Sequence, residues 1–144
     1  MKKKLTIAAV SLFSLLCLSA SLAQVDEREP LLSVKEVMNA LITPATTTIW
    51  GAYQLQTEAE WQEVRNAALS VIAAGNLLLF GGAEEGESET AVEAGWKAHN
   101  QQMIAAARLV IVAADNKDEE ALSAAGNDAL YPPCESCHQQ YQAR

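Results

Sequence analysis

Five consecutive residues carry the clearest chemistry in this sequence. They are Cys134-Glu135-Ser136-Cys137-His138, which follow the pattern C-x-x-C-H. Two thiols at this spacing lie one helical turn apart and can add to the two vinyl groups of a haem, while the adjacent imidazole reaches the iron. The motif therefore predicts one covalently bound haem c, attached at Cys134 and Cys137, with His138 as the proximal iron ligand.

Three other chemistries use closely spaced cysteines, and the rest of the sequence argues against each. A thioredoxin-like redox pair belongs at a junction between a strand and a helix, and no strand pattern precedes Cys134. A disulfide between the two cysteines would close only a very short loop. A zinc site needs a fourth ligand, for which only His99 or an acidic side chain is available, because no second cysteine pair exists.

The start of the sequence has the pattern of an export signal. Three lysines precede an apolar run at Leu5–Leu22, and Ser21 and Ala23 place small residues where a signal peptidase recognises them. We therefore expect residues 1–23 to be a signal peptide and residues 24–144 to form a periplasmic domain. A retained membrane anchor is the alternative, but serines interrupt the run and an acidic stretch follows it. Export agrees with the motif, because haem c is attached outside the cytoplasm in bacteria.

The predicted mature chain has 121 residues, which is enough for one compact domain with one core. Without the three lysines of the signal peptide, 7 Lys and Arg residues remain against 18 Asp and Glu, so the formal charge falls from −8 to −11. This charge argues against nucleic acid or anionic lipid as a partner. We expect a redox partner protein with a cationic docking patch, and a homodimer is the other association that we consider.

Four segments have apolar residues at the i, i+3, i+4 spacing of amphipathic helices, and no segment of similar length alternates as a strand would. We therefore expect an all-α domain. Short connections favour antiparallel neighbours, which predicts an antiparallel four-helix bundle with the haem attached near its C-terminus. The predicted boundaries are residues 32–53, a second helix from a Thr57/Glu60 capping box to Gly81-Gly82, residues 90–114, and a fourth helix capped by Asn116 or Asp118.

Prolines interrupt two of these predicted helices. Pro44 lies inside the first helix and removes the hydrogen bond to the carbonyl of Ala40, so we expect a kink or a break there. In the fourth helix, Gly126 weakens the helix and Pro132-Pro133 interrupts its hydrogen bonding. We therefore expect a separate short helix that begins near Pro133 and carries the C-x-x-C-H motif.

A C-x-x-C-H motif that follows four amphipathic helices resembles the class II c-type cytochromes, the cytochrome c′ and cytochrome c556 family. The resemblance covers the whole predicted mature chain in architecture, whereas only the last helix carries a specific motif. Cys134, Cys137 and His138 match the attachment and proximal residues of that family, and Tyr141 matches its aromatic residue three positions later. Gln142 departs from the pattern, because many cytochromes c′ have a basic residue there.

The resemblance places the first helix against the other face of the iron, where a methionine of that helix can be the distal ligand. Met38 lies on the inward line of the first helix and is the predicted ligand, although methionine also often fills cores. His99 and Met103 are rival candidates, because both lie on the apolar face of the third helix. Lys35 lies one turn before Met38 and is either a haem propionate contact or a solvated lysine.

Two functions agree with these residues. One is electron transfer through a His/Met-ligated haem, and the other is binding of NO or CO by a five-coordinate haem, as the resemblance to cytochrome c′ implies. We expect the first, because Met38 is available as a ligand and Gln142 departs from the gas-binding pattern. No cluster of acidic and basic residues lies near the expected distal side, so we do not expect an enzyme.

Overall fold

The computed structural model describes residues 29–142, so the predicted signal peptide lies outside the described residues. This part of the chain contains helices and no strand, which confirms the all-α prediction. None of its helices is both long enough and apolar enough to cross a membrane. The elements, with η marking π-helical stretches, are α1 (Val34–Val37), η1 (Met38–Ile42), α2 (Thr43–Gly51), α3 (Glu58–Leu78), α4 (Glu87–Ala91), α5 (Ala94–Asn116), α6 (Glu119–Ala124), η2 (Ala125–Leu130), α7 (Tyr131–Cys137) and η3 (His138–Gln142).

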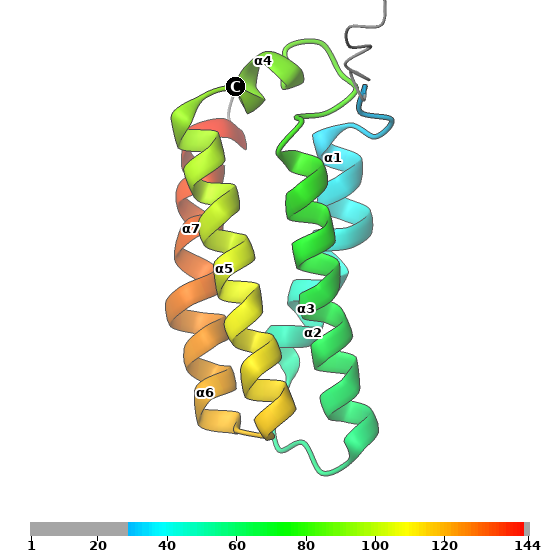
Figure 1. Cartoon of the computed structure of the whole chain (residues 1–144), viewed down its shortest axis with the longest axis vertical. Helices are drawn as coiled ribbons and strands as arrows, with labels where there is room; N and C mark the ends of the chain where they lie inside the picture. Colours follow the sequence, from blue (N-terminus) through cyan, green and yellow to red (C-terminus); the bar gives the residue numbers. More distant parts are fainter. Residues whose placement is uncertain (1–28, 143–144) are drawn as a thin grey trace, which may run out of the picture.

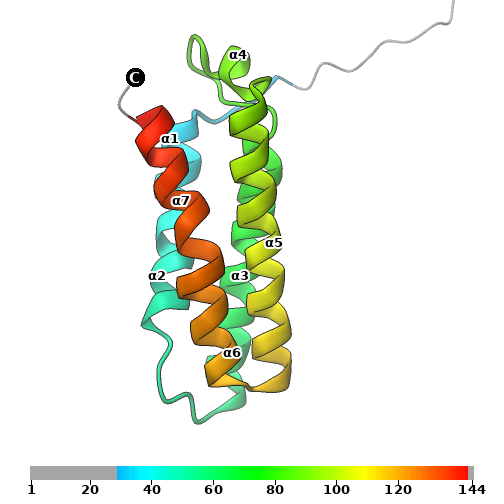
Figure 2. The same ribbon diagram turned by 90° about the vertical axis from the view of Figure 1, so that its left-hand side faces the viewer.

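These elements join into long helical runs that lie side by side (Figures 1 and 2). The first run is α1–η1–α2, the second is α3, the third is α5, and the last is α6–η2–α7–η3. Each run reverses the direction of the one before it, while α4 lies across one end. Short connections at residues 52–57 and 117–118 make these reversals possible.

The core lies where α3 packs against α5. One line of α3 is buried, namely Trp61, Val64, Ala68, Val71, Gly75 and Leu78. The apolar line of α5 is also buried from Trp96 onward, except that His99 is only half-buried. Val92 is 70% exposed, because the predicted third helix is interrupted after Ala91 and α5 begins at Ala94.

The predicted helix ends are confirmed where they depend on local hydrogen bonds. The Thr57 hydroxyl accepts the Glu60 backbone N–H, and the Glu60 carboxylate accepts the Thr57 N–H at 2.7 Å. Backbone N–H groups of Gln56 and Thr57 lower the pKa of Glu60, because they stabilise its charged form. Gly81 follows α3 with φ +83°, a backbone conformation that residues other than glycine rarely adopt. Asp118 caps α6, because its side chain accepts the Ala121 N–H.

Of the kink or break that the sequence predicts at Pro44, the break is wrong, because the helix continues through this residue. The stretch Met38–Ile42 is π-helical, and the Thr43 N–H bonds the carbonyl of Met38 five residues earlier. A π turn adds one residue to the helical turn, which relieves the clash that a proline ring makes with the preceding turn. The first helical run therefore passes Pro44 without stopping.

A π-helical stretch also precedes Pro132-Pro133 in the last run, and the helix continues through both prolines. The predicted separate helix near Pro133 is therefore wrong. Residues Ala125–Leu130 are π-helical, and the Tyr131 N–H bonds the carbonyl of Gly126. The run continues without interruption from Glu119 to Gln142. Gly126 and the two prolines are therefore parts of one continuous helix.

Gly75 sets how closely α3 and α5 approach. A Cβ at this position would lie 2.6 Å from Cγ1 of Ile104 and 3.2 Å from Cε of Met103, whereas a Cβ at Gly51 would meet nothing within 4 Å. We predict that Gly75→Ala lowers the free energy of unfolding by about 1–3 kcal/mol through overpacking. Gly51→Ala should raise it by about 0.4–1 kcal/mol. Urea titrations of both variants measure these changes, and equal effects would contradict close packing at Gly75.

Candidate functional site

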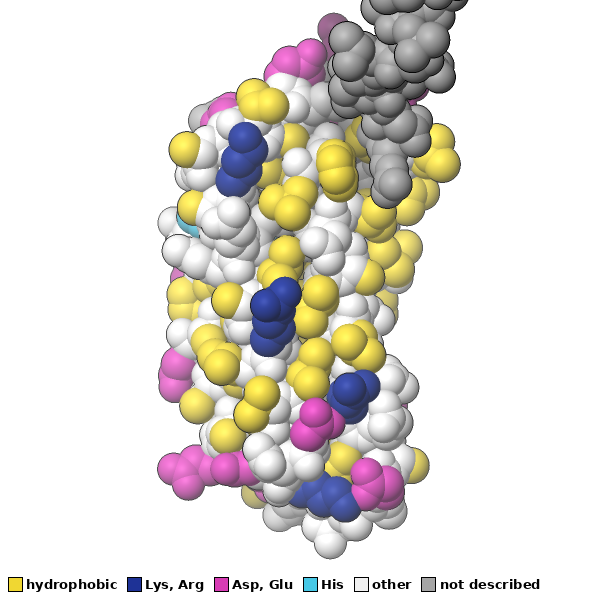
Figure 3. Space-filling model, viewed as in Figure 1, with side chains coloured by type: hydrophobic (Ala, Val, Ile, Leu, Met, Phe, Trp, Pro, Cys, Tyr) yellow, Lys and Arg dark blue, Asp and Glu magenta, His cyan; other side chains and the backbone are white. Residues whose placement is uncertain are grey.

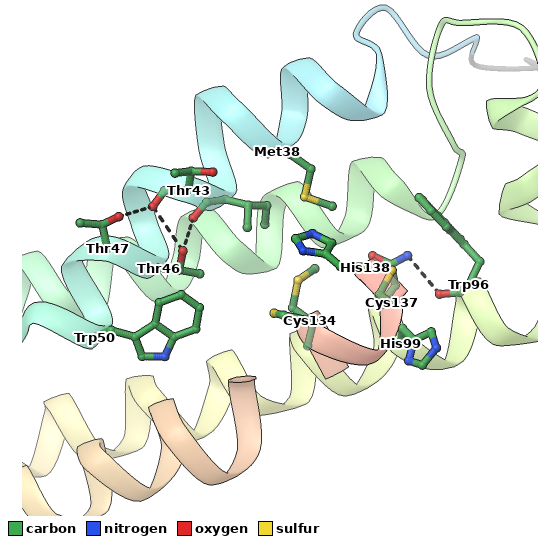
Figure 4. Close-up of a pocket in the computed structure, with 13 residues that line it drawn as sticks. Met38, Thr43, Thr46, Thr47, Trp50, Trp96, His99, Cys134, Cys137 and His138 are labelled. Atoms are coloured by element: carbon green, nitrogen blue, oxygen red, sulfur yellow. Dashed lines mark hydrogen bonds between the residues drawn. The ribbon is translucent and has the colours of Figure 1, made fainter. Parts of the chain in front are cut away.

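One cavity collects most of the residues that the sequence singled out. Its empty space is about 840 Å³, including the mouth that opens to solvent, and its lining is mostly apolar. The first run, α5 and the last run each supply part of the wall, as Figure 4 shows. Concave, largely apolar sites with a few polar groups are typical of cofactor binding.

The last run contributes the C-x-x-C-H residues to this cavity. Cys134 and Cys137 are both half-buried and lie one turn apart on α7, and His138 follows them as the first residue of η3. Burial raises the pKa of Cys134 to about 11, and the neighbouring Cys137 adds to this shift. Burial also raises the pKa of Cys137. Both thiols are therefore protonated at neutral pH.

Met38 lies on the opposite wall. Its half-buried side chain extends from η1 toward the imidazole of His138 (Figure 4). Met38 and His138 are each the first residue of a π-helical stretch, a feature that is frequent at functional sites. The thioether of Met38 therefore points toward the imidazole of His138, although the two residues are 100 positions apart in the sequence.

Threonines of the first run form much of the remaining wall. The Thr46 hydroxyl donates to the Ile42 carbonyl at 2.9 Å, and the Thr47 hydroxyl donates to the Thr43 carbonyl at 2.8 Å. These side chains therefore satisfy their polar groups within their own helix. Sequence reasoning missed them, although residues 38, 42, 46 and 50 are spaced by four and share one helical face.

Trp50 stands at one end of the cavity and Trp96 at the other (Figure 4). The Trp50 indole N–H donates to the Gly126 carbonyl at 3.0 Å, which joins the first run to the last. The Trp50 ring also meets Tyr131 edge to face, with a centroid distance of 6.2 Å. Trp50 therefore ties the two walls of the cavity together.

At the other end, the Trp96 indole N–H donates to the Leu78 carbonyl at 2.6 Å. Its ring meets Tyr141 edge to face at 5.2 Å, and the Tyr141 hydroxyl donates to the Glu93 carboxylate at 3.1 Å. These contacts hold η3, which begins with His138, against the start of α5. Trp61 is buried in α3 and does not line the cavity.

His99 and Met103 also reach the cavity from α5. His99 Nε2 lies 3.3 Å from Oε1 of Gln140, whose Nε2 donates to the Tyr141 hydroxyl at 3.0 Å. Because the Tyr141 hydrogen goes to Glu93, Gln140 turns its amide nitrogen to Tyr141 and its oxygen to His99. The hydrogen of His99 is then on Nε2, and its buried Nδ1 has no hydrogen-bond partner among the described residues.

Lys35 is exposed on α1 and does not line the cavity, so its contact with a propionate stays a prediction. The fold does not bring further zinc ligands to the two cysteines. The described residues contain no group of three or more His, Cys, Asp or Glu side chains that could hold a metal ion.

No protein-family model, curated protein or solved structure matches the chain. The site itself is therefore the ground for any inference about function.

Two thiols, an imidazole and a thioether are groups that could together hold a haem, the thiols through covalent bonds and the other two through the iron. The lining agrees with such a ligand in two respects. It is mostly apolar, and the His99 Nδ1 on its wall lacks a partner among the described residues. Cys134, Cys137, His138 and Met38 line the same cavity, and Lys35 lies outside it.

The raised thiol pKa values predict slow alkylation of the haem-free protein. At pH 8 a thiol with a pKa of about 11 is roughly a hundredfold less ionised than one with the ordinary value of 9.0. We expect iodoacetamide to modify folded Cys134 far more slowly than the urea-unfolded chain, as measured by mass spectrometry.

The same shift should destabilise the folded haem-free chain at alkaline pH. The unfolded thiols lose their protons first, so the stability contribution is complete below about pH 9 and is lost as the pH rises toward 11. Equal alkylation rates in the folded and unfolded chains would contradict the burial of Cys134.

Proposed function

We propose that this chain is an exported c-type cytochrome whose helical runs form an antiparallel four-helix bundle like that of the class II cytochromes. It carries one haem c in the cavity and transfers electrons, without acting as an enzyme. The observation that supports this proposal best is the placement of Cys134, Cys137 and His138 on one wall of an apolar cavity and of Met38 on the other.

In this proposal Cys134 and Cys137 would hold the haem through two thioether bonds, each formed by addition of one thiol S–H across one vinyl group, so that no further reagent would be needed. Bound haem supplies an iron atom that gains and loses one electron. Cys134 and Cys137 would hold the ring at α7, and the His138 nitrogen and the Met38 sulfur, which line the same cavity, would be available to the iron. Thioether ligation opposite histidine raises the reduction potential, which suits electron transfer.

The surrounding side chains present few free polar groups to the site, although its mouth is open to solvent. Thr46 and Thr47 donate their hydroxyl hydrogens to their own helix, and Trp50 and Trp96 stand at the two ends. The hydrogen bond from Trp50 to Gly126 keeps the walls at a fixed separation. A rigid, apolar surrounding lowers the structural change that accompanies electron transfer, because few dipoles need to reorient.

The second candidate function is reversible binding of NO or CO by a five-coordinate haem. One observation favours it. The wall beside Met38 includes apolar Ile42 and Thr46, whose hydroxyl is already bonded to its own helix. These two side chains offer no free hydrogen-bond donor to a bound gas. The two functions differ in whether the Met38 sulfur binds the haem iron.

The covalent attachment predicts a mass. Protein expressed in a bacterial host with haem-maturation machinery should have the mass of the mature chain plus one haem, and the haem should resist acid-acetone extraction. Cys134→Ala with Cys137→Ala should lose this haem, because no thioether bond can form. Ser136→Ala, which lies between the two cysteines, should keep it. An intact mass without haem from such a host would refute the proposal.

The axial ligand is tested by Met38→Ala. Ferric wild type should be low-spin with a sulfur-to-iron charge-transfer band, and the variant should lose that band. Its reduction potential should fall by roughly 0.1–0.3 V, within the ~0.8 V range that axial ligands span, because the lost thioether stabilised ferrous iron. The ferrous variant should also bind CO rapidly. Optical spectra and redox titration measure both changes.

Met103→Leu and His99→Ala are the matched controls, since both residues line the cavity from α5. Both variants should keep the charge-transfer band. If wild type is instead high-spin and binds CO freely, Met38 only fills space and gas binding replaces electron transfer. A band that survives Met38→Ala and disappears in His99→Ala would assign the distal ligand to α5.

A further inference from the structure

We propose that a cationic redox partner docks on the outward side of α2 and the last helical run, beside the cavity mouth. This inference rests on the proposed function, because it assumes that electrons enter and leave through that mouth. We define the docking surface by an aromatic group and an acidic group of residues. They are Trp50, Tyr53 and Tyr131, and Glu120, Asp128 and Glu135.

The aromatic group connects the cavity to the solvent. Trp50 is 43% exposed although it also lines the cavity, and its ring packs edge to face on Tyr131, which is 50% exposed. Tyr53 is 75% exposed and lies with Trp50 along a shallow hollow between α2 and α6. Exposed aromatic side chains of this kind are enriched at the centres of protein interfaces, where they supply large contact areas.

Acidic side chains border the aromatic group. Residues 118–142 contain five Asp and Glu and no Lys or Arg. Asp128 and Glu135 stand three residues before and four residues after Tyr131 on the same helical run, and Glu120 lines the hollow beside Trp50 and Tyr53. All three carboxylates are exposed and have no ion pair among the described residues. The surface therefore has an aromatic centre and a negative edge.

The cations lie elsewhere. Of the Lys and Arg side chains in the described part, all except Lys35 belong to α3, α5 or the residue that follows α5. They stand among exposed apolar side chains on the face that Figure 3 shows, where α3 and α5 lie in front. Arg65 pairs there with Asp115, and Lys117 pairs with Glu58. The docking surface therefore has carboxylates and no Lys or Arg, whereas the cations of α3 and α5 stand on the face of Figure 3 together with acidic side chains.

This distribution of charge indicates the chemistry of the partner. A protein with Lys and Arg around an apolar contact would be attracted and turned toward the cavity mouth, whereas an acidic one would be repelled. Such steering raises association rates and weakens with salt. The same charge disfavours a second copy meeting through this surface, because its carboxylates would face identical carboxylates.

The test uses the haem-loaded protein and a strongly basic, lysine-rich cytochrome as the probe. Stopped-flow measurements give the second-order rate constant of electron transfer at low and high salt. Glu120→Gln with Asp128→Asn should lower the low-salt rate constant by roughly three- to tenfold and flatten its salt dependence. The control, Glu63→Gln with Glu89→Gln, removes the same charge from exposed residues outside the surface and should change the rate less than twofold. Acetylation of the probe's lysines should also abolish the salt dependence.

Binding is measured separately by chemical-shift changes, which need no electron transfer. Shifts that concentrate on the docking surface, and that weaken in Tyr53→Ser, would support the proposal. Intact binding without electron transfer would refute the proposed function and leave the surface standing. Equal slowing by the two charge pairs would show an effect of net charge alone and overturn the proposal. Salt-sensitive self-association that Glu120→Gln with Asp128→Asn abolishes would also overturn it, because the occupant would be a second copy.

Discussion

Prolines remove backbone hydrogen-bond donors from the first and the last of the three helical runs that form the cavity. The rest of the site depends on how the chain compensates for this loss. In each run a π turn precedes the prolines, with bonds from Thr43 to Met38 and from Tyr131 to Gly126. A broken helix would separate residues on the two sides of the break. The π turns instead keep each wall on one continuous helix.

The Gly126 carbonyl connects the two helical runs that contain these π turns. It accepts the N–H of Tyr131 within its own run and the indole N–H of Trp50 from the first run. The irregular turn that accommodates Pro132-Pro133 therefore also anchors the opposite wall. The same oxygen atom therefore takes part in the π turn before Pro132-Pro133 and in the contact that holds the two cavity walls at their separation.

The buried face of α5 has two roles. It packs closely on α3, where Gly75 leaves no space for a further carbon atom beside Ile104 and Met103. Trp96 and Met103 of this face, which also contact α3, reach the cavity as well, together with His99. Space that side chains leave open lowers stability, so a ligand that fills the cavity would stabilise the folded chain. Dense packing between α3 and α5 thus supports the open site beside it.

Local patterns predicted much of this arrangement. The helical periodicity, the Thr57 cap and the C-x-x-C-H spacing each depend on a few neighbouring residues. The unbroken runs could not be predicted in this way, because Pro44 and Pro132-Pro133 predict interruption unless the π turns are known. Sequence analysis did not identify Thr46 and Thr47 on the cavity wall, because threonine is classed as a polar residue. The hydrogen bonds that their hydroxyls form within their own helix cannot be recognised from the sequence. The haem and its ligands stay predictions that the cavity supports.

The placement of the tryptophans would give a haem-loaded domain an optical signal of its own. Trp50 and Trp96 border the cavity, while Trp61 is buried in α3. A porphyrin absorbs at the wavelengths at which indoles emit, so a haem in the cavity would quench their fluorescence by energy transfer. Trp50 is separated from Cys134 by 84 residues along the chain and Trp96 by only 38. The emission that returned on unfolding of the haem-loaded chain would therefore come mainly from the N-terminal half of the domain, and its intensity would follow how far that half had moved from the proposed ring.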